Sequence, residues 1–293
     1  MPPSRLSAPP EMVYRPRFPL PASRVPATNT KGRVTMLPTP RPRPARFLVP
    51  MTMLLVAAAT AAGPGPASPG LIQVGAMHEV IGAGATQGRV ALADAAAAPH
   101  LYAVGALAGL RGEITIIDSA VFVSSVGAGG ALQAREGAEL EATLLLGAQV
   151  PAWTDTTLER DVPAGEVDAV LGAIAAAAGL DPAAPFMFRA TGDFADAHVH
   201  VINGACPVHA RNRGLEILAD RAPDDRRFAH VAGTLVGVRA EGAAGRLTHP
   251  GTSIHAHLVY RDDATGAHVT GHVEKVALGA GTVVSVPRRA DAP

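Results

Sequence analysis

The sequence of 293 residues contains one cysteine, few aromatic side chains and no excess of charge of either sign. The single thiol, Cys206, excludes an intramolecular disulfide and a zinc site built on several cysteines. Aromatic residues make up only 4% of the chain, so its core has to be built from Ala, Val, Leu and Ile. Lys plus Arg and Asp plus Glu are both 25, which leaves no surplus of positive charge to neutralise phosphates. We therefore expect no nucleic-acid partner.

The N-terminal part of the chain differs in composition from the rest. Residues 1–46 are rich in Pro and Arg and have no hydrophobic period, so they are predicted to form a disordered or mis-annotated extension. A basic flank then precedes the apolar run from Phe47 to Ala62, and small residues follow it. These three parts are typical of a secretory signal peptide. The run is shorter than the roughly 20 apolar residues of a membrane span. We expect residues 47–69 to direct secretion or periplasmic export, with a membrane anchor as the alternative, and 70–293 to form the folded domain.

The pattern of residues 70–293 predicts more strand than helix. Apolar residues at helical spacing and the following Gly179 predict one helix at 166–178. Gly192-Asp193 suggests a hairpin between two of the predicted strands. The strands are expected at 101–104, 113–118, 120–126, 141–150, 186–191, 197–202, 233–239, 252–260, 267–278 and 282–286. The fold class is therefore α+β or mixed α/β.

Histidines gather in the predicted hairpin near the C-terminus. His255 and His257 share one face of a strand, because side chains two apart point the same way. The turn at 262–266 returns the chain so that His268 falls on that face in either of two registers, but register alone does not choose between His268 and His272. Three histidines on one face can form an open zinc site with a fourth position for water or substrate. The alternative is a row of exposed or hydrogen-bonded histidines.

A second His-x-His pair, His198 and His200, lies on another predicted strand. It has no third histidine at hairpin distance, although His209 is close in sequence. Cys206 has no predicted helix start to lower the pKa of its thiol, which favours a structural or incidental role over a catalytic one.

The segment from Gly233 to Val276 resembles the signature of the α-acetolactate decarboxylases. In that family a Gly-Thr-x-x-Gly-Phe segment is followed by Pro-Gly, His-x-His on a strand, and Gly-Gly-His-Val after a turn. The corresponding residues are Gly233–Gly237, Pro250-Gly251, His255-x-His257 and Gly266–Val269. The resemblance implies that Zn²⁺ is held by His255, His257 and His268. It also implies a strand-rich two-layer fold with mixed β-sheets and few helices.

Two further blocks resemble the family in the same order. Gly105–Glu113 is similar to the family's Gly-Thr-Phe-x-x-Leu-Asp-Gly-Glu, and Phe188–Phe194 is similar to its Arg-x-x-Gly-x-Phe. The resemblance implies catalytic roles for Glu113 as proton donor and for Arg189 as the group that holds the substrate carboxylate. The implied reaction is decarboxylation of 2-acetolactate, or a related 2-hydroxy-3-oxo acid, to acetoin and CO2. A small-molecule substrate and a possible homodimer follow as expected partners.

The chain also departs from the family pattern. His198–Asn203 stands where the family has Lys-Thr-Arg-Thr-Val-Pro, and no residue matches the acid that the family's C-terminal tail places near the metal. Ala106 and Val238 replace a Thr and a Phe. One alternative is therefore an exported metal- or ligand-binding module without decarboxylase activity. Another is a different metal enzyme, although an oxygenase would usually need a carboxylate ligand that the spacing does not supply.

Overall fold

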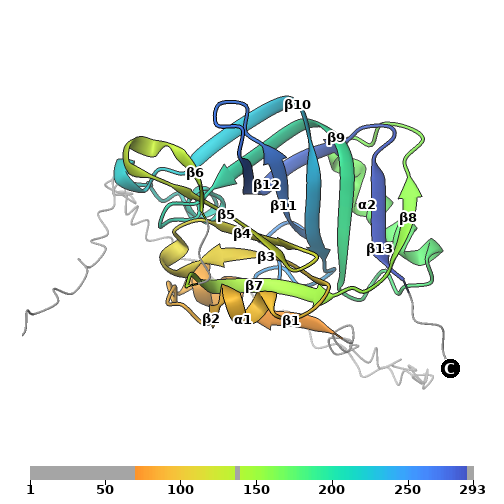
Figure 1. The fold of residues 1–293 in the computed structure, drawn as a ribbon, viewed down its shortest axis with the longest axis horizontal. Coiled ribbons are helices and arrows are strands. Elements are labelled where there is room, and N and C mark those ends of the chain that lie inside the picture. Colours follow the sequence, from red (N-terminus) through yellow and green to blue (C-terminus); the bar gives the residue numbers. More distant parts are fainter. Residues whose placement is uncertain (1–69, 136–138, 289–293) are drawn as a thin grey trace, which may run out of the picture. The chain divides into compact units, whose positions relative to one another are not determined.

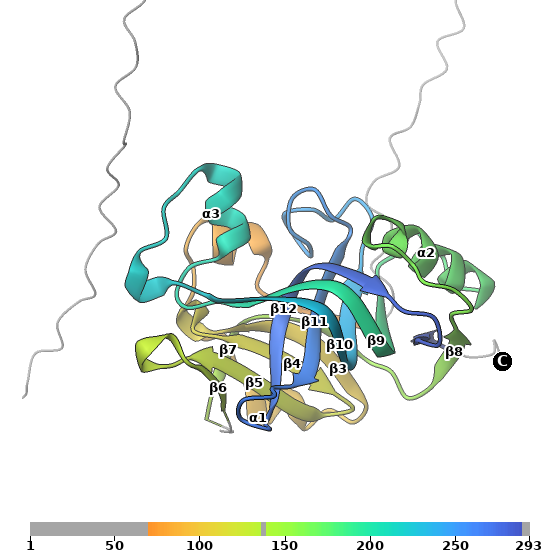
Figure 2. The same cartoon turned by 90° about the horizontal axis from the view of Figure 1, so that it is seen from above.

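Two β-sheets lie face to face in the computed structural model, which describes residues 70–135 and 139–288 (Figures 1 and 2). The predicted extension at 1–46 and the predicted signal region at 47–69 fall outside the described residues. Among the described helices, none is long and apolar enough to cross a membrane.

The first sheet has the strand order β1-β7-β3-β4-β5-β6, and β2 pairs with β7. Helix α1 covers its outer face, where buried Leu92 packs against Leu101 and Ile114. Its elements are β1 (Leu71–Val74), η1 (His78–Gly82), β2 (Val90–Ala91), α1 (Leu92–Ala96), β3 (Leu101–Leu107), η2 (Ala108–Leu110), β4 (Glu113–Ile117), β5 (Ala120–Val126), η3 (Ala128–Gly130), β6 (Leu132–Arg135) and β7 (Glu141–Gln149).

The second sheet has the order β10-β11-β12-β9-β13-β8, and β9 also pairs with β10, so that β9 to β12 close on themselves. Helix α2 covers its outer face, where Leu171 and Phe188 share one buried cluster. Its elements are β8 (Trp153–Thr157), η4 (Ala164–Glu166), α2 (Val167–Ala177), β9 (Phe186–Val201), α3 (Pro207–Arg213), η5 (Ala219–Arg221), β10 (Asp224–Arg239), β11 (Ile254–Arg261), β12 (His268–Leu278) and β13 (Val283–Pro287).

The sheets are joined by apolar packing and by buried polar links. Val104 of β3 and Val236 of β10 belong to one cluster of buried side chains. Nearby, the hydroxyls of Thr115 and Thr270 lie 2.6 Å apart, and the Thr270 amide donates to the Ser124 hydroxyl at 2.8 Å. Buried hydroxyls need such partners, so these bonds fix how β12 lies across β4 and β5.

The strand-rich architecture with few helices is confirmed, but every strand-to-strand pairing among the described residues is antiparallel, where mixed sheets were expected. The hairpin predicted at Gly192-Asp193 is wrong, because β9 runs without a turn from Phe186 to Val201. Gly192 has φ +156°, and an added Cβ would lie 2.9 Å from the Thr282 Cα. The glycine therefore admits the close approach of another segment inside a strand rather than forming a turn.

A local irregularity in β9 reverses which side chains face α2. In the first part of β9, the even-numbered Phe188 and Phe194 belong to the buried cluster under α2. In the last part, the odd-numbered Val199 and Val201 belong to it. The switch in parity occurs at Asp196, which has φ +47°. The even-numbered residues His198 and His200 therefore leave the apolar cluster and turn to the opposite face.

Candidate metal centre

Three histidines of the C-terminal hairpin converge on the space between the sheets. His255 and His257 lie two residues apart on β11 and share one face, and His272 of β12 is the register partner of His257. One ligand nitrogen from each of the three rings lies within 4.8 Å of the others. The ring centroids are 5.3 Å apart for His255 and His257, 5.1 Å for His255 and His272, and 5.5 Å for His257 and His272.

His268 does not join this group, which corrects the third residue of the set predicted from the family signature. The strands pair Arg261 with His268, so His268 lies at the far end of β12, is exposed, and meets the Phe122 ring at 6.3 Å. His268 lies outside the group because the turn between β11 and β12 is wide. The Asp262 carboxylate accepts from both the amide and the hydroxyl of Thr265 at 2.9 Å, which holds a six-residue connection between the strands.

The three buried rings are neutral and carry free nitrogen lone pairs. His257 donates from Nδ1 to the Ile114 carbonyl at 2.9 Å, while its Nε2 and the Nδ1 of His255 have no hydrogen-bond partner. Burial lowers the pKa of His257 to about 3 and the pKa values of His255 and His272 well below the usual range. Unpartnered buried polar atoms cost free energy unless something binds them. Neutral imidazoles with inward lone pairs are suitable zinc ligands, so the residues present fit a metal ion.

Glu113, to which the resemblance assigned the role of proton donor, lies beside this group. It opens β4 directly after Gly112, whose φ is +147° and whose added Cβ would lie 2.2 Å from the Ser124 carbonyl oxygen. The Glu113 carboxyl has Oε2 3.6 Å from Nε2 of His257, and its Oε1 accepts from the Ile202 amide at 3.4 Å. Burial raises the pKa of Glu113 to about 8. The group is therefore mostly protonated at neutral pH.

Arg189, to which the resemblance assigned the substrate carboxylate, does not line the cavity beside the histidines. Its guanidinium stacks 5.0 Å from the Trp153 ring and 5.9 Å from the Tyr102 ring, and it donates to the Ser285 hydroxyl at 3.2 Å. A carboxylate oxygen of Asp155 lies 3.9 Å from the Arg189 guanidinium. These contacts join β9 to its neighbours, and they give Arg189 a structural role in this conformation.

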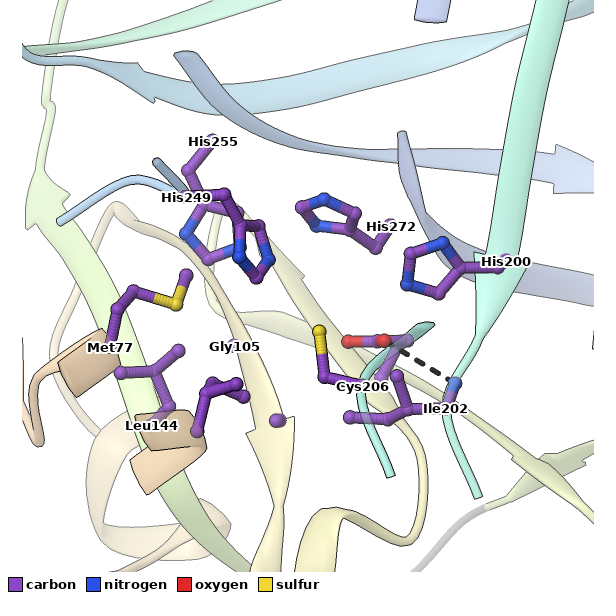
Figure 3. Close-up of a pocket in the computed structure, with 12 residues that line it drawn as sticks. Met77, Gly105, Leu144, His200, Ile202, Cys206, His249, His255 and His272 are labelled. Carbon is purple, nitrogen blue, oxygen red and sulfur yellow. Dashed lines mark hydrogen bonds between the residues drawn. The ribbon is translucent and has the colours of Figure 1, made fainter. Parts of the chain in front are cut away.

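The histidines open on a cavity of about 20 Å³, which is room for an ion and little else (Figure 3). None of the described residues that line it is Arg or Lys. The lining residues are Met77, Ile81, Gly105, Ala106, Glu113, Leu144, His200, Ile202, Cys206, His249, His255 and His272.

The rival pair, His198 and His200, is bound to carboxylates. Nδ1 of His200 donates to Glu274 at 3.0 Å, and Nε2 of His198 pairs with Asp225 at 2.9 Å. The other nitrogen of His198 is 3.7 Å from Glu274, which also forms an ion pair with Arg211. Although His198, Asp225 and Glu274 are close enough to hold a metal, both ring nitrogens of His198 already face carboxylates. This cluster therefore fits an ion-pair network better than a metal site.

Two of the lining residues, His249 and Cys206, differ from what the sequence indicated. His249 precedes the Pro-Gly of the signature in a loop, where no periodicity indicates its direction. Cys206 does stand at a helix start, contrary to the sequence expectation, since its sulfur accepts from the His209 amide at the N-terminus of α3. Burial nevertheless raises the pKa of the Cys206 thiol to about 11, which keeps it protonated and unreactive.

The fold and the site define a protein of two antiparallel sheets that enclose a buried three-histidine group able to hold a metal ion. The family follows from sequence comparison. The sequence model for alpha-acetolactate decarboxylase matches residues 73–286, and the chain belongs to that family. Among curated proteins, no sequence matches.

Solved structures agree with the fold. A Staphylococcus aureus protein of unknown function similar to alpha-acetolactate decarboxylase has TM-score 0.56 and 15% identity, covering 75% of this chain and 85% of its own. Acetolactate decarboxylase from Bacillus subtilis subspecies spizizenii has TM-score 0.55 and 14% identity, covering 75% and 86%. Alpha-acetolactate decarboxylase from Bacillus subtilis strain 168 has TM-score 0.53 and 16% identity, covering 75% and 90%. At these identities, the likeness shows the fold alone.

Proposed function

We propose that the protein is a zinc-dependent carboxy-lyase that converts 2-acetolactate, or a related 2-hydroxy-3-oxo acid, to acetoin and CO2. Membership of the decarboxylase family supports this reaction class. The observation that carries the proposal is the pair of unpartnered nitrogens on His255 and His257, next to the buried carboxyl of Glu113. On this proposal, the metal ion and the proton donor would lie side by side.

The chemistry divides between the metal and the protein. His255, His257 and His272 would hold the ion, which supplies Lewis-acid stabilisation of the negative charge left when CO2 departs. Glu113 would donate its proton to the carbon that lost CO2. The Ile202 amide keeps the carboxyl group in place, and the surrounding apolar side chains keep water away from it. Because the cavity is small, Met77 and Ile81 have to move aside when an acid of this size enters, which a flexible methionine permits.

A second candidate is a metal- or ligand-binding module on the same fold, without decarboxylase activity. It is favoured by one observation: no cationic side chain lines the described cavity, and Arg189 lies elsewhere. A substrate carboxylate would therefore lack the bidentate arginine that the family resemblance implied.

The deciding experiment measures acetoin and CO2 release from 2-acetolactate by the purified, zinc-loaded protein. Metal-depleted protein is the control. We expect turnover that disappears on chelation and returns when zinc is added. Zinc-loaded protein that releases neither product would refute decarboxylation and leave the binding module.

We also propose that the protein is exported, with residues 47–69 acting as a signal and cleavage region. The basic flank and the short apolar run support this proposal. The mature protein is then expected to begin between about Ala58 and Gly70, which N-terminal sequencing of the extracellular or periplasmic fraction tests. A soluble cytoplasmic protein that begins at Met1 or Met36 would contradict it. A homodimer stays a prediction, to be measured by sedimentation.

A further inference from the structure

A fourth histidine faces the three-histidine group from a loop. His249 follows β10 and precedes β11, and it is only 7% exposed. Its ring centroid lies 5.0 Å from that of His272 and 6.2 Å from that of His255. Figure 3 shows His249 beside His255 among the residues that line the same cavity. His249 is therefore next to two of the three proposed ligands.

The loop holds His249 by its backbone and leaves the ring free. The Thr248 hydroxyl donates to the Thr252 carbonyl at 2.6 Å, and the Thr252 amide donates to the His249 carbonyl at 3.3 Å. Within the described part of the chain, no hydrogen bond uses a ring nitrogen of His249. The ring therefore keeps its nitrogens available to an ion in the cavity that it lines.

His200 is the competing residue, and its surroundings differ. Its ring centroid is 4.9 Å from that of His272, but its Nδ1 is already bonded to the Glu274 carboxylate. Such a carboxylate partner also occurs behind metal-bound histidines, so His200 has to be tested beside His249. Of the two rings, His249 lies near two members of the ligand group and forms no hydrogen bond through its ring in the described chain. It is outside the set of ligand atoms that lie within 4.8 Å of one another, so the loop has to shift for His249 to bind the ion.

We infer that His249 is the fourth ligand of the metal ion in the resting protein. Zinc is usually four-coordinate, and three histidines leave one position open. The inference rests on the metal site of the proposed function. Since decarboxylation needs an open position, His249 has to release the ion when a substrate oxygen binds. Its place in a loop, rather than in a strand, allows that movement.

The test removes the metal by chelation and titrates the full chain with Co²⁺ while recording visible absorption. X-ray absorption of the zinc-loaded protein then counts the imidazole ligands. The variants are H249A and H249N, with H200A as the competitor and H268A as a matched exposed control. We expect four imidazoles in the wild type and three in both His249 variants. The metal dissociation constant should rise by at least about 100-fold, because a direct ligand should contribute no less than an outer-shell partner does.

Several outcomes decide the matter. Unchanged spectra and affinity in a folded H249N protein would overturn the inference, as would a loss of one imidazole in H200A but not in H249N. H249N tests the role even if H249A does not fold. Metal-loaded wild type that binds through four imidazoles but shows no turnover would refute decarboxylation and support the His249 assignment. A wild type that binds no divalent metal would overturn both.

Discussion

The chain carries two His-x-His motifs on strands of the same sheet, His255 with His257 on β11 and His198 with His200 on β9. All four rings are buried. On β9, both rings are paired with carboxylates. On β11, Nδ1 of His255 and Nε2 of His257 have no hydrogen-bond partner in the described chain. The Glu113 carboxyl lies 3.6 Å from Nε2 of His257, which is too far for a hydrogen bond.

This difference shows that the spacing of histidines does not define a metal site. Carboxylates at both nitrogens, as at His198, leave no nitrogen for a metal ion, whereas an unpartnered buried nitrogen is available to bind one. The contrast predicts that the two motifs respond oppositely to substitution, and each prediction below tests one part of it.

The largest expected effect separates the motifs directly. His257→Ala removes a proposed ligand, so metal content should fall sharply and turnover should be abolished, because three ligands are the minimum for an open site. His198→Ala removes a ring bound to Asp225 and should leave the metal content unchanged. Elemental analysis of both purified variants measures this. Equal metal loss in the two variants would show that the β11 and β9 motifs do not differ in metal binding.

The second prediction concerns the partner strand. His272→Ala should lose metal as His257→Ala does, because His272 faces His257 across the hairpin. His268→Ala is the matched control, because this residue is exposed at the far end of β12 and should retain full metal content. If His268→Ala loses the metal while His272→Ala keeps it, the register of the hairpin in solution is the one that the family signature implies.

The third prediction separates the metal from the proton source. Glu113→Gln keeps the size of the side chain but removes its acidic proton. We expect kcat to fall about 10²- to 10⁴-fold, as for loss of a general acid, with metal content unchanged. Steady-state kinetics with parallel zinc analysis measures both. Full turnover in Glu113→Gln would show that another group delivers the proton.

The fourth prediction addresses the carboxylate that serves the β9 motif. Burial alone would raise the pKa of Glu274, but the hydrogen bond from His200 and the nearby charges of His198 and Arg211 lower it to about 2. A carboxyl with a lowered folded-state pKa stabilises the fold above its ordinary pKa of 4.5, and this contribution is lost as the pH falls toward 2.

Glu274→Gln should therefore destabilise the metal-free protein by about 1–3 kcal/mol at pH 7, the cost of leaving buried donors without their charged acceptor. The difference from wild type should shrink below pH 4.5 and vanish near pH 2. Urea unfolding across this range measures it, with the exposed Glu166→Gln as control. A difference that does not depend on pH would show that the ion pairs add nothing.

These contrasts also show what the sequence can predict. Periodicity places β11 and β12 within a few residues of their observed bounds and puts His255 and His257 on one face. It does not give the register, because the Asp262 side chain widens the turn through bonds that no alternation pattern reveals.

The sequence also does not reveal to which face of the sheet the β9 side chains turn. The positive φ of Asp196 shifts the alternation within the strand and turns His200 toward the cavity. Glu113 was identified only through the family resemblance, because a glutamate after a tight turn is as often exposed as buried. The position of Arg189 was not predictable, because an arginine on a strand can reach a site or an aromatic pair with the same local pattern.

The smallest expected effect concerns Arg189, at the other end of β9. Its guanidinium stacks on Trp153 and Tyr102 and does not line the cavity, so Arg189→Ala should leave KM, kcat and metal content unchanged. The loss of the cation–π contacts should lower the free energy of unfolding by about 1 kcal/mol, measured by urea unfolding. Arg261→Ala, an exposed strand-end arginine, is the control and should change neither quantity. A higher KM for 2-acetolactate in Arg189→Ala alone would show that this arginine reaches the substrate in the working enzyme, and would make β9 a second contributor to the site.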